Sequence, residues 1–219
     1  MWIEYIRSAQ FGPTLVDGGD FSDLKTLKDH GWNLNAGHDF EGISSKVEID
    51  TIQAEHESGV LKLSVDAEVK GTIDDLPPVL EQPVAAVETA PITPEIPILP
   101  GQFVRITVQV KMPRPVSDGI GGLIIRDSWG GEPMQFAFCS MLTDWREIVL
   151  FRRCPGPEPL TITLGMAGYG AVYFDELKVE RIEDPSVRET RPGGSGGVAR
   201  TRPAAGVPSA SRPISPPRQ

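Results

Sequence analysis

The residues Phe103–Met112, FVRITVQVKM, place an apolar side chain at every second position. One side of this run carries Val104, Ile106, Val108, Val110 and Met112, and the other side carries Arg105, Thr107, Gln109 and Lys111. Because side chains alternate between the two faces of a strand, the pattern predicts a strand with one buried and one solvated face. We therefore expect an all-β fold in which antiparallel strands form two sheets packed face to face.

Several other short runs have a strand-like composition and are separated by Gly, Pro or Asp turns. They are 47–51, 61–67, 122–127, 134–140, 147–153, 160–166 and 171–182. A helical turn is expected only at 21–30, ended by Gly31, and the Pro-rich residues 74–100 admit one edge strand at 84–89. About eight to ten strands without a long helix predict an antiparallel two-sheet β-sandwich, or jelly roll.

Composition separates the 219 residues into one ordered domain and a tail. We expect 1–13 to be an N-terminal lead-in ended by Pro13, 14–184 to be the jelly-roll sandwich, and 185–219 to be a disordered tail rich in Pro, Gly, Ser and Arg. From Ser186 onward six arginines stand against one glutamate, a net charge of +5; since the whole chain has −9, the remainder has −14. An acidic body repels nucleic acid and anionic membrane surfaces, so neither is expected as a partner.

Two cysteines, Cys139 and Cys154, are too few for a disulfide framework. A tight turn at Thr143-Asp144 would place Cys139 beside Ile148, so we expect free thiols. No apolar stretch is long enough to span a bilayer, and the start of the chain lacks the apolar core of a signal peptide. The protein is therefore expected either not to be exported or to be a piece of a longer chain.

A series of motifs follows in an order that is similar to a known family. The motifs are LVDGGDF, the pair Gly31-Trp32, SGVLKLSV, PGQFVRITVQVKM, DWREIVLFRR and GAVYFDELKVERI. In this order they resemble carbohydrate-binding-module-like, or galactose-binding-like, jelly-roll domains over residues 15–182. The segment DGIGGLIIRDSWGGEPM is similar to a variant of this fold found in large exported proteins. The resemblance implies a jelly roll of an extracellular or cell-surface protein, with a glycan as the ligand that some relatives bind.

The resemblance also implies a structural calcium site, which joins an acid of the first motif to an aspartate of the last strand; Ser22 replaces that acid here. Strand alternation puts Asp175 on one face with Leu177, and a buried carboxylate there must be paired or bound to a metal. Asp17 and Asp20 would supply further oxygen ligands for calcium if the first and last strands are neighbours. Alternatively, a bulge turns Asp175 outward, or an arginine or backbone amides satisfy it.

Sugars have apolar C–H faces and hydroxyl edges, so a binding site needs an exposed aromatic ring flanked by hydrogen-bonding side chains. Trp129 lies in the polar loop RDSWGGEP beside Arg126 and Asp127, and Tyr169 lies in another loop, GMAGYGA. These four residues are the predicted ligand contacts. The alternative is that the two aromatic rings only cover an end of the sandwich.

The remaining residues form no recognisable catalytic motif. Trp32 and Trp145 are expected to anchor the core, as large rings usually do in such sandwiches. The sequence lacks the nucleophile-elbow, metalloprotease, phosphate-loop and dinucleotide motifs, and its three histidines lack the spacing of a zinc site. We therefore expect no enzyme but a non-catalytic carbohydrate-binding-like module with a glycan partner. The alternative is a structural or adhesive module that binds a protein partner and has no sugar affinity.

Overall fold

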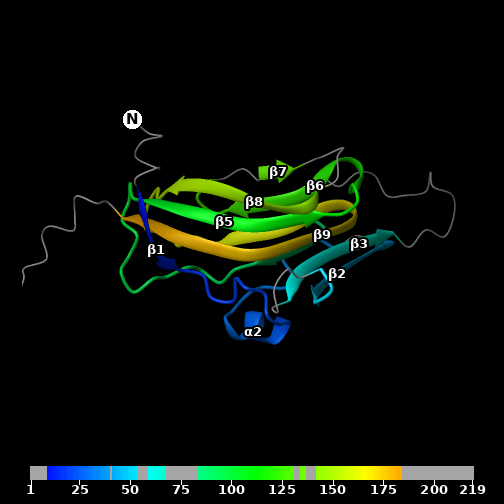
Figure 1. Ribbon diagram of the computed structural model, residues 1–219, viewed down its shortest axis with the longest axis horizontal. Helices are drawn as coiled ribbons and strands as arrows, with labels where there is room; N and C mark the ends of the chain where they lie inside the picture. Colours follow the sequence, from blue (N-terminus) through cyan, green and yellow to red (C-terminus); the bar gives the residue numbers. More distant parts are fainter. Residues whose placement is uncertain are drawn as a thin grey trace, which may run out of the picture. The chain divides into compact units, whose positions relative to one another are not determined.

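The computed structural model of the protein describes residues 9–39, 41–53, 59–67, 83–130, 134–136 and 142–183 (Figure 1). The chain divides into two compact units, Met1–Pro185 and Ser186–Gln219, and every described residue belongs to the first. The predicted tail and Cys139 lie outside the described residues. Cys154 is buried and carries a free thiol.

Strands account for nearly all of the regular structure in the described residues. The elements are β1 (Gln10–Thr14), α2 (Leu24–Asp29), β2 (Ile43–Asp50), β3 (Val60–Ala67), β4 (Ala85–Glu88), β5 (Phe103–Met112), β6 (Ser117–Asp127), β7 (Met134–Phe136), β8 (Leu142–Arg153) and β9 (Ile162–Glu183). Every strand pair is antiparallel. The predicted all-β antiparallel fold is confirmed. In the part of the chain that the structure describes, no helix is long and apolar enough to cross a membrane.

The strands form two sheets, here named sheet A and sheet B. Sheet A has the order β2-β3-β9-β5-β8, and β1 pairs with the final residues of β9. In sheet B, β4 and β6 both pair with the first residues of β9, and β7 pairs with β6. The strand β9 therefore belongs to both sheets, as expected for a two-layer sandwich whose corner is made by one bending strand.

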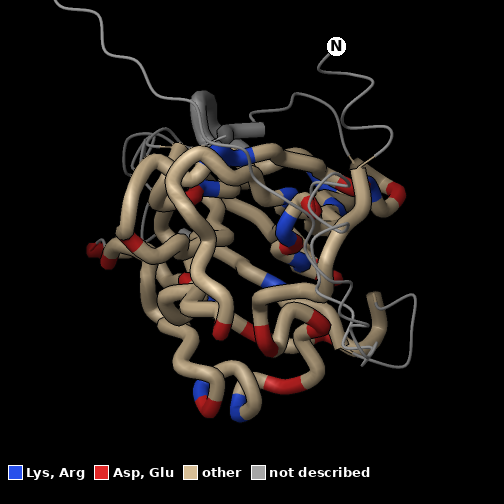
Figure 2. The backbone as a smooth tube through the Cα atoms, turned by 90° about the vertical axis from the view of Figure 1, so that its left-hand side faces the viewer, with Lys and Arg blue, Asp and Glu red and all other residues tan. Residues whose placement is uncertain are grey.

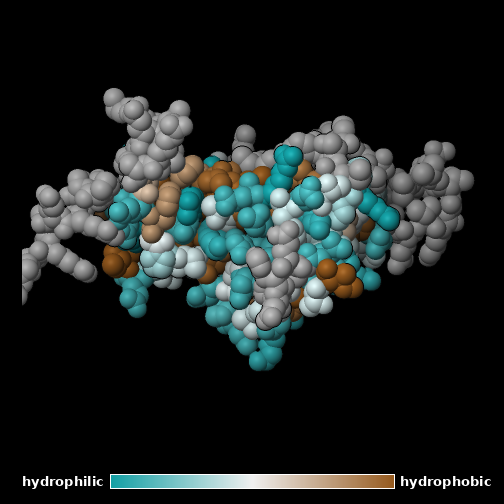
Figure 3. Space-filling model, viewed as in Figure 1, coloured by the Kyte–Doolittle hydropathy of each residue, from teal (hydrophilic) through white to brown (hydrophobic). Residues whose placement is uncertain are grey.

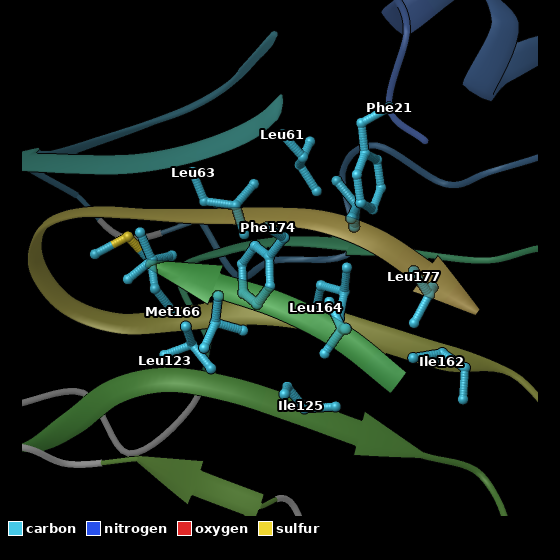
Figure 4. Packing of buried hydrophobic residues seen from close by; sticks show 14 of the residues in the cluster. Phe21, Leu61, Leu63, Leu123, Ile125, Ile162, Leu164, Met166, Phe174 and Leu177 are labelled. Carbon is cyan, nitrogen blue, oxygen red and sulfur yellow. The ribbon is translucent and has the colours of Figure 1, made fainter. Parts of the chain in front are cut away.

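The change of sheet takes place at Gly168 and Gly170. Residues before this point pair with β4 and β6, and residues from Gly170 onward pair with β3 and β5. Gly168 has φ 106° and Gly170 has φ 135°, values that residues with a Cβ rarely adopt. Figures 1 and 4 show the strand turning back so that its two halves face each other. The sequence predicted these halves as two strands, at 160–166 and 171–182.

The core lies between the sheets and holds the side chains that the alternation predicted to be buried. The five apolar side chains of β5 are at most 1% exposed. Opposite them in Figure 4, apolar side chains of both halves of β9 meet those of β3 and β6; the labelled examples are Leu61, Leu63, Leu123, Ile125, Leu164, Met166 and Phe174. Full burial of a side chain of this size contributes about 1.5–3 kcal/mol, so a shift of register by one residue would be strongly disfavoured.

The helix α2 confirms the predicted helical turn at 21–30. Asp23 caps its first turn, because the Asp23 carboxylate accepts hydrogen bonds from the Thr26 hydroxyl at 2.6 Å and the Thr26 backbone N–H at 2.8 Å. These bonds lower the pKa of Asp23. Gly31 follows the helix with φ 79°, the left-handed conformation that commonly ends a helix.

The first strand begins before the expected start of the domain. We placed residues 10–13 in the lead-in and began the sandwich at Thr14, but β1 runs over Gln10–Thr14. Gln10 lies opposite Glu183 and Thr14 lies opposite Glu180 in β9. Within the described residues β1 pairs on one side only, and an edge strand of this kind tolerates Pro13. The expectation was wrong because the partner of β1 lies at the other end of the described chain, beyond the reach of any local pattern.

The sheet change of β9 can be tested by adding a Cβ to Gly170. A Cβ there would meet nothing closer than 3.7 Å, so the cost of Gly170→Ala arises from the backbone conformation at φ 135° rather than from a clash. We expect a loss of about 1–3 kcal/mol in the free energy of unfolding, measured with urea. Gly156→Ala is the matched control, because a Cβ there has open space and no positive φ is recorded; its effect should stay within about 0.5 kcal/mol. Equal effects of the two substitutions would contradict this account.

Candidate functional site

Asp127, a predicted ligand contact, is the last residue of β6 and organises the turn that follows. Its side chain is 1% exposed. The carboxylate accepts hydrogen bonds from the backbone N–H groups of Trp129 at 3.1 Å and Gly130 at 2.5 Å, and from Arg152 Nε at 2.5 Å. Arg152 lies on β8, an edge strand of sheet A, so this ion pair joins β6 of sheet B to sheet A. The contacts of Asp127 are therefore structural ones within the chain.

Trp129 covers an end of the sandwich. Its half-buried ring packs against the core, and its indole N–H donates to the backbone oxygen of Glu158 at 2.9 Å. The position of Trp129 therefore matches the alternative in which the loop rings cover an end of the sandwich. Arg126, next to the turn, is half-buried, and its Nε is a buried atom that meets no acceptor within the described residues.

The structure does not bring all four predicted ligand contacts together. Asp127 lies opposite Ile162, at the start of β9, whereas Tyr169 lies at the bend where β9 changes sheets. Seven residues of extended strand separate Ile162 from Tyr169, or about 23 Å at a rise of about 3.3 Å per residue. Arg126, Asp127 and Trp129 therefore lie near one end of sheet B and Tyr169 near the other.

Asp175 lies beside a β-bulge, and the expectation that it shares a face with Leu177 is wrong. Thr107 of β5 lies opposite Lys178 while Gln109 lies opposite Asp175, so β9 has one extra residue between these pairs. Glu176 takes up the extra length with φ 48°. A bulge of this kind reverses which side chains point inward, which puts Leu177 in the core and Asp175 on the outer side of sheet A.

Asp175 is buried and bonded to a backbone amide, which matches the alternative in which backbone amides satisfy its carboxylate. The side chain is only 5% exposed, and its Oδ1 accepts a hydrogen bond from the backbone N–H of Glu176 at 2.7 Å. Among the described residues no group of three or more His, Cys, Asp or Glu could hold a metal ion. Asp17, Asp20 and Asp175 therefore do not form such a group, and the calcium site stays a prediction.

A row of polar and aromatic side chains crosses the outer side of sheet A. Glu48, Lys62, Tyr173 and Lys111 lie opposite one another on successive strands, and Lys111 Nζ lies 5.7 Å from the centre of the Trp145 ring. Figure 3 shows this face as mainly hydrophilic. Burial raises the pKa of Tyr173. Burial acts to lower the pKa of Lys62, but the Glu48 carboxylate at 3.3 Å raises it overall.

The predicted solvated face of β5 belongs to this outer side, and Arg105 on it is ion-paired. Arg105 donates to Glu180 at 2.6 Å and its guanidinium lies 3.5 Å from the centre of the Phe11 ring. Thr107 is buried, and the other three polar side chains of β5 are half-buried. This face is therefore partly covered rather than freely solvated.

The two tryptophans expected in the core have different positions. Trp32 is 5% exposed, meets Phe21 edge to face at 5.6 Å between ring centres, and donates to the backbone oxygen of Asp17, so its core role is confirmed. Trp145 is half-buried on the outer side of sheet A, and the expectation for it is wrong. Leu150 of the same strand points inward, and Trp145 precedes it by an odd number of residues, so the two point to opposite faces.

The sequence reasoning missed a groove at the end of the sandwich, here named the end groove, with a volume of about 760 Å³. It lies between residues 12–17, residues 89–96 and the end of β9. Polar side chains at the groove are Thr14, Asp17, His30, Thr93, Glu95, Arg181 and Glu183, and the proline rings are those of Pro13, Pro91 and Pro94. His30 and Trp32 also line it, so four separate segments of the chain form the groove and no spacing in the sequence could have predicted it.

Arg181 holds one wall of the end groove. Its guanidinium donates to the backbone oxygen of Ile96, which fixes residues 95–97 beside β9. Its Nε is buried and has no acceptor in the part of the chain that the structure describes. The groove thus offers a guanidinium donor, carboxylate and hydroxyl groups, and apolar proline rings to a ligand. Clefts of about 300–1,000 Å³ with a few placed polar groups are typical small-molecule sites.

No protein-family model and no curated protein matches the chain. Among solved structures it is similar to a protein from Bacteroides thetaiotaomicron named as sugar binding, with TM-score 0.50, 8% identity, and coverage of 77% of this chain and 99% of that one. It is also similar to the CBM22-1 xylan-binding domain of Paenibacillus barcinonensis Xyn10C, with TM-score 0.44, 14% identity, and coverage of 81% and 99%. A third is the enzymatically active domain of bacteriophage CBA120 tailspike protein 4, with TM-score 0.44, 16% identity and 77% of this chain covered; the chain spans 21% of that protein.

The first of these similarities establishes a shared fold. The chain shares its two-sheet β fold with that protein, and the fold that the resemblance implies is confirmed.

The structural role of Trp129 can be separated from a ligand contact by substitution. Trp129→Ala removes a half-buried ring and one hydrogen bond, so we expect a loss of about 2 kcal/mol in the free energy of unfolding. Trp129→Phe keeps most of the ring and should cost about 1 kcal/mol. Urea unfolding measures both values. An unchanged stability in both variants would show that the ring does not cover the sandwich end.

Proposed function

We propose that the protein is a non-catalytic carbohydrate-binding module that holds a glycan in the end groove. The observation that supports this most is the groove itself, because its wall combines the two kinds of contact that a sugar makes. Proline rings can pack against the C–H face of a sugar ring, and Thr14, Thr93 and the carboxylates can hydrogen-bond with its hydroxyls. A module of this kind would act in an exported or cell-surface protein.

The interior of the groove supports the same proposal. Trp32 and Ile92 are buried at its floor, and both are fixed by backbone contacts: Trp32 donates to the Asp17 backbone oxygen, and Ile92 forms an isolated β-bridge with Leu160. A floor fixed in this way loses little conformational freedom on binding. The contacts available are few, so we expect a dissociation constant of about 10⁻⁴ M.

The second candidate is a structural or adhesive module that binds a protein and has no sugar affinity. One observation favours it: Ile96 and Leu99 are 69% and 58% exposed, close together in the segment that forms the groove wall. Exposed apolar side chains that cluster are a common feature of protein-binding surfaces. The two candidates differ in what should happen when the protein meets free glycans.

A glycan array followed by calorimetric titration of the best ligand tests the proposal. Thr93→Leu removes a hydroxyl from an exposed position in the groove and adds non-aromatic bulk, and it should weaken binding at least tenfold. Thr143→Leu is the matched control, because Thr143 is an exposed threonine on β8 away from the groove, and its variant should bind as the parent does. No binding on the array, or equal binding by both variants, would leave the protein-binding candidate as the better account.

A further inference from the structure

The end groove carries an unbalanced negative charge. Asp17 and Glu95 are exposed and Glu183 is half-buried, and among the described residues that line the groove Arg181 alone is positively charged when His30 is counted as neutral. The Arg181 guanidinium is bonded to the Ile96 oxygen of the groove wall. Figure 2 views the molecule from the left-hand side of Figure 1 and shows acidic residues, together with some basic ones, in the lower part of the view.

Some carboxylates on the outer side of sheet A are paired with cations: Glu180 with Arg105, Glu48 with Lys62, and Glu176 with Lys178. Glu147, on the same side, is exposed and forms no ion pair with any described residue. Asp17 and Glu95 likewise form no ion pair with any described residue. A concave site lined by one sign of charge concentrates ligands of the opposite sign and repels those of the same sign.

The ligand that matches the groove must combine three properties. It needs hydroxyl oxygens to accept from the half-buried Arg181 guanidinium, ring faces to pack against Pro91 and Pro94, and positive charge to meet Asp17 and Glu95. Sugars with a free, protonated amino group have all three properties. Glycans with uronate or sulfate groups have the first two but would place like charges together, which is a common means of excluding a wrong partner.

We infer that the end groove selects glycans built from amino sugars with free amino groups, accepts uncharged glycans more weakly, and excludes acidic ones. This inference rests on the proposed glycan-binding function and specifies its ligand class. The carboxylates Asp17 and Glu95 are the residues that set the preference. Carboxylate-to-ammonium contacts at such exposed positions are screened by salt, so the preference must weaken as the ionic strength rises.

Three oligosaccharides of equal length test the inference by titration calorimetry at pH 7: a tetramer of glucosamine, the same tetramer fully N-acetylated, and a tetramer of a uronic acid. We expect the glucosamine tetramer to bind at least tenfold more tightly than the acetylated one at 20 mM salt. We expect this ratio to fall at 500 mM salt, and the uronate tetramer to show no binding. Equal affinities for the first two, or binding of the uronate, would overturn the inference.

The double variant Asp17→Asn/Glu95→Gln should bind the two glucosamine-type tetramers with nearly equal affinity. The matched control is Asp144→Asn/Glu147→Gln, which removes the same charge from two exposed residues of β8 and should keep the tenfold preference. A loss of preference in the control as well would show that net charge, not the groove, sets it. Binding of the acetylated tetramer without any preference would refute the inference alone, whereas binding of no glycan on the array would refute the proposed function.

Discussion

The structure depends on one strand that belongs to both sheets. The first half of β9 pairs with β4 and β6, the second half pairs with β1, β3 and β5, and the chain turns between them at Gly168 and Gly170. Because each half is paired along both edges, the position of β9 sets the register of both layers. The pairing of both sheets therefore requires the two φ values at the turn, 106° and 135°.

Different groups of residues lie beside the start and beside the final residues of β9. Beside the start of β9, the Asp127–Arg152 pair and the ring of Trp129 close one part of the sandwich. Beside its final residues, Arg181 ties residues 95–97 to the sheet and leaves the end groove next to them. A buried ion pair adds little stability compared with apolar packing, but removal of one partner is costly. We therefore interpret Asp127 and Arg152 as residues that fix the geometry of this end.

Local alternation predicted most of the strands, because a side-chain period of two is visible wherever one face is buried. The runs at 103–112 and 61–67 are strands with the expected inward sides. Alternation does not predict the inward-pointing side chains correctly where a strand contains an extra residue. The extra residue at Glu176 reverses the inward side of β9, so a reading in steps of two placed Asp175 with the core residue Leu177. A bulge depends on pairing with a distant strand, and the sequence around Asp175 contains no signal for it.

The candidate site was less predictable than the fold, for a related reason. The sequence draws attention to aromatic rings in loops, but Trp129 and Asp127 have their polar atoms engaged within the chain. The end groove is built instead from common residues, among them Pro91, Thr93 and Glu95, in a stretch whose prolines indicated only an extended connection. Its chemistry arises where separate segments of the chain meet at one end of β9. In a sandwich whose sheet faces are covered or paired, the ends are where polar groups can stay unpaired without disturbing the core. For that reason a ligand site here depends on the charge and shape of connecting segments, while the alternation that defines the fold carries no information about them.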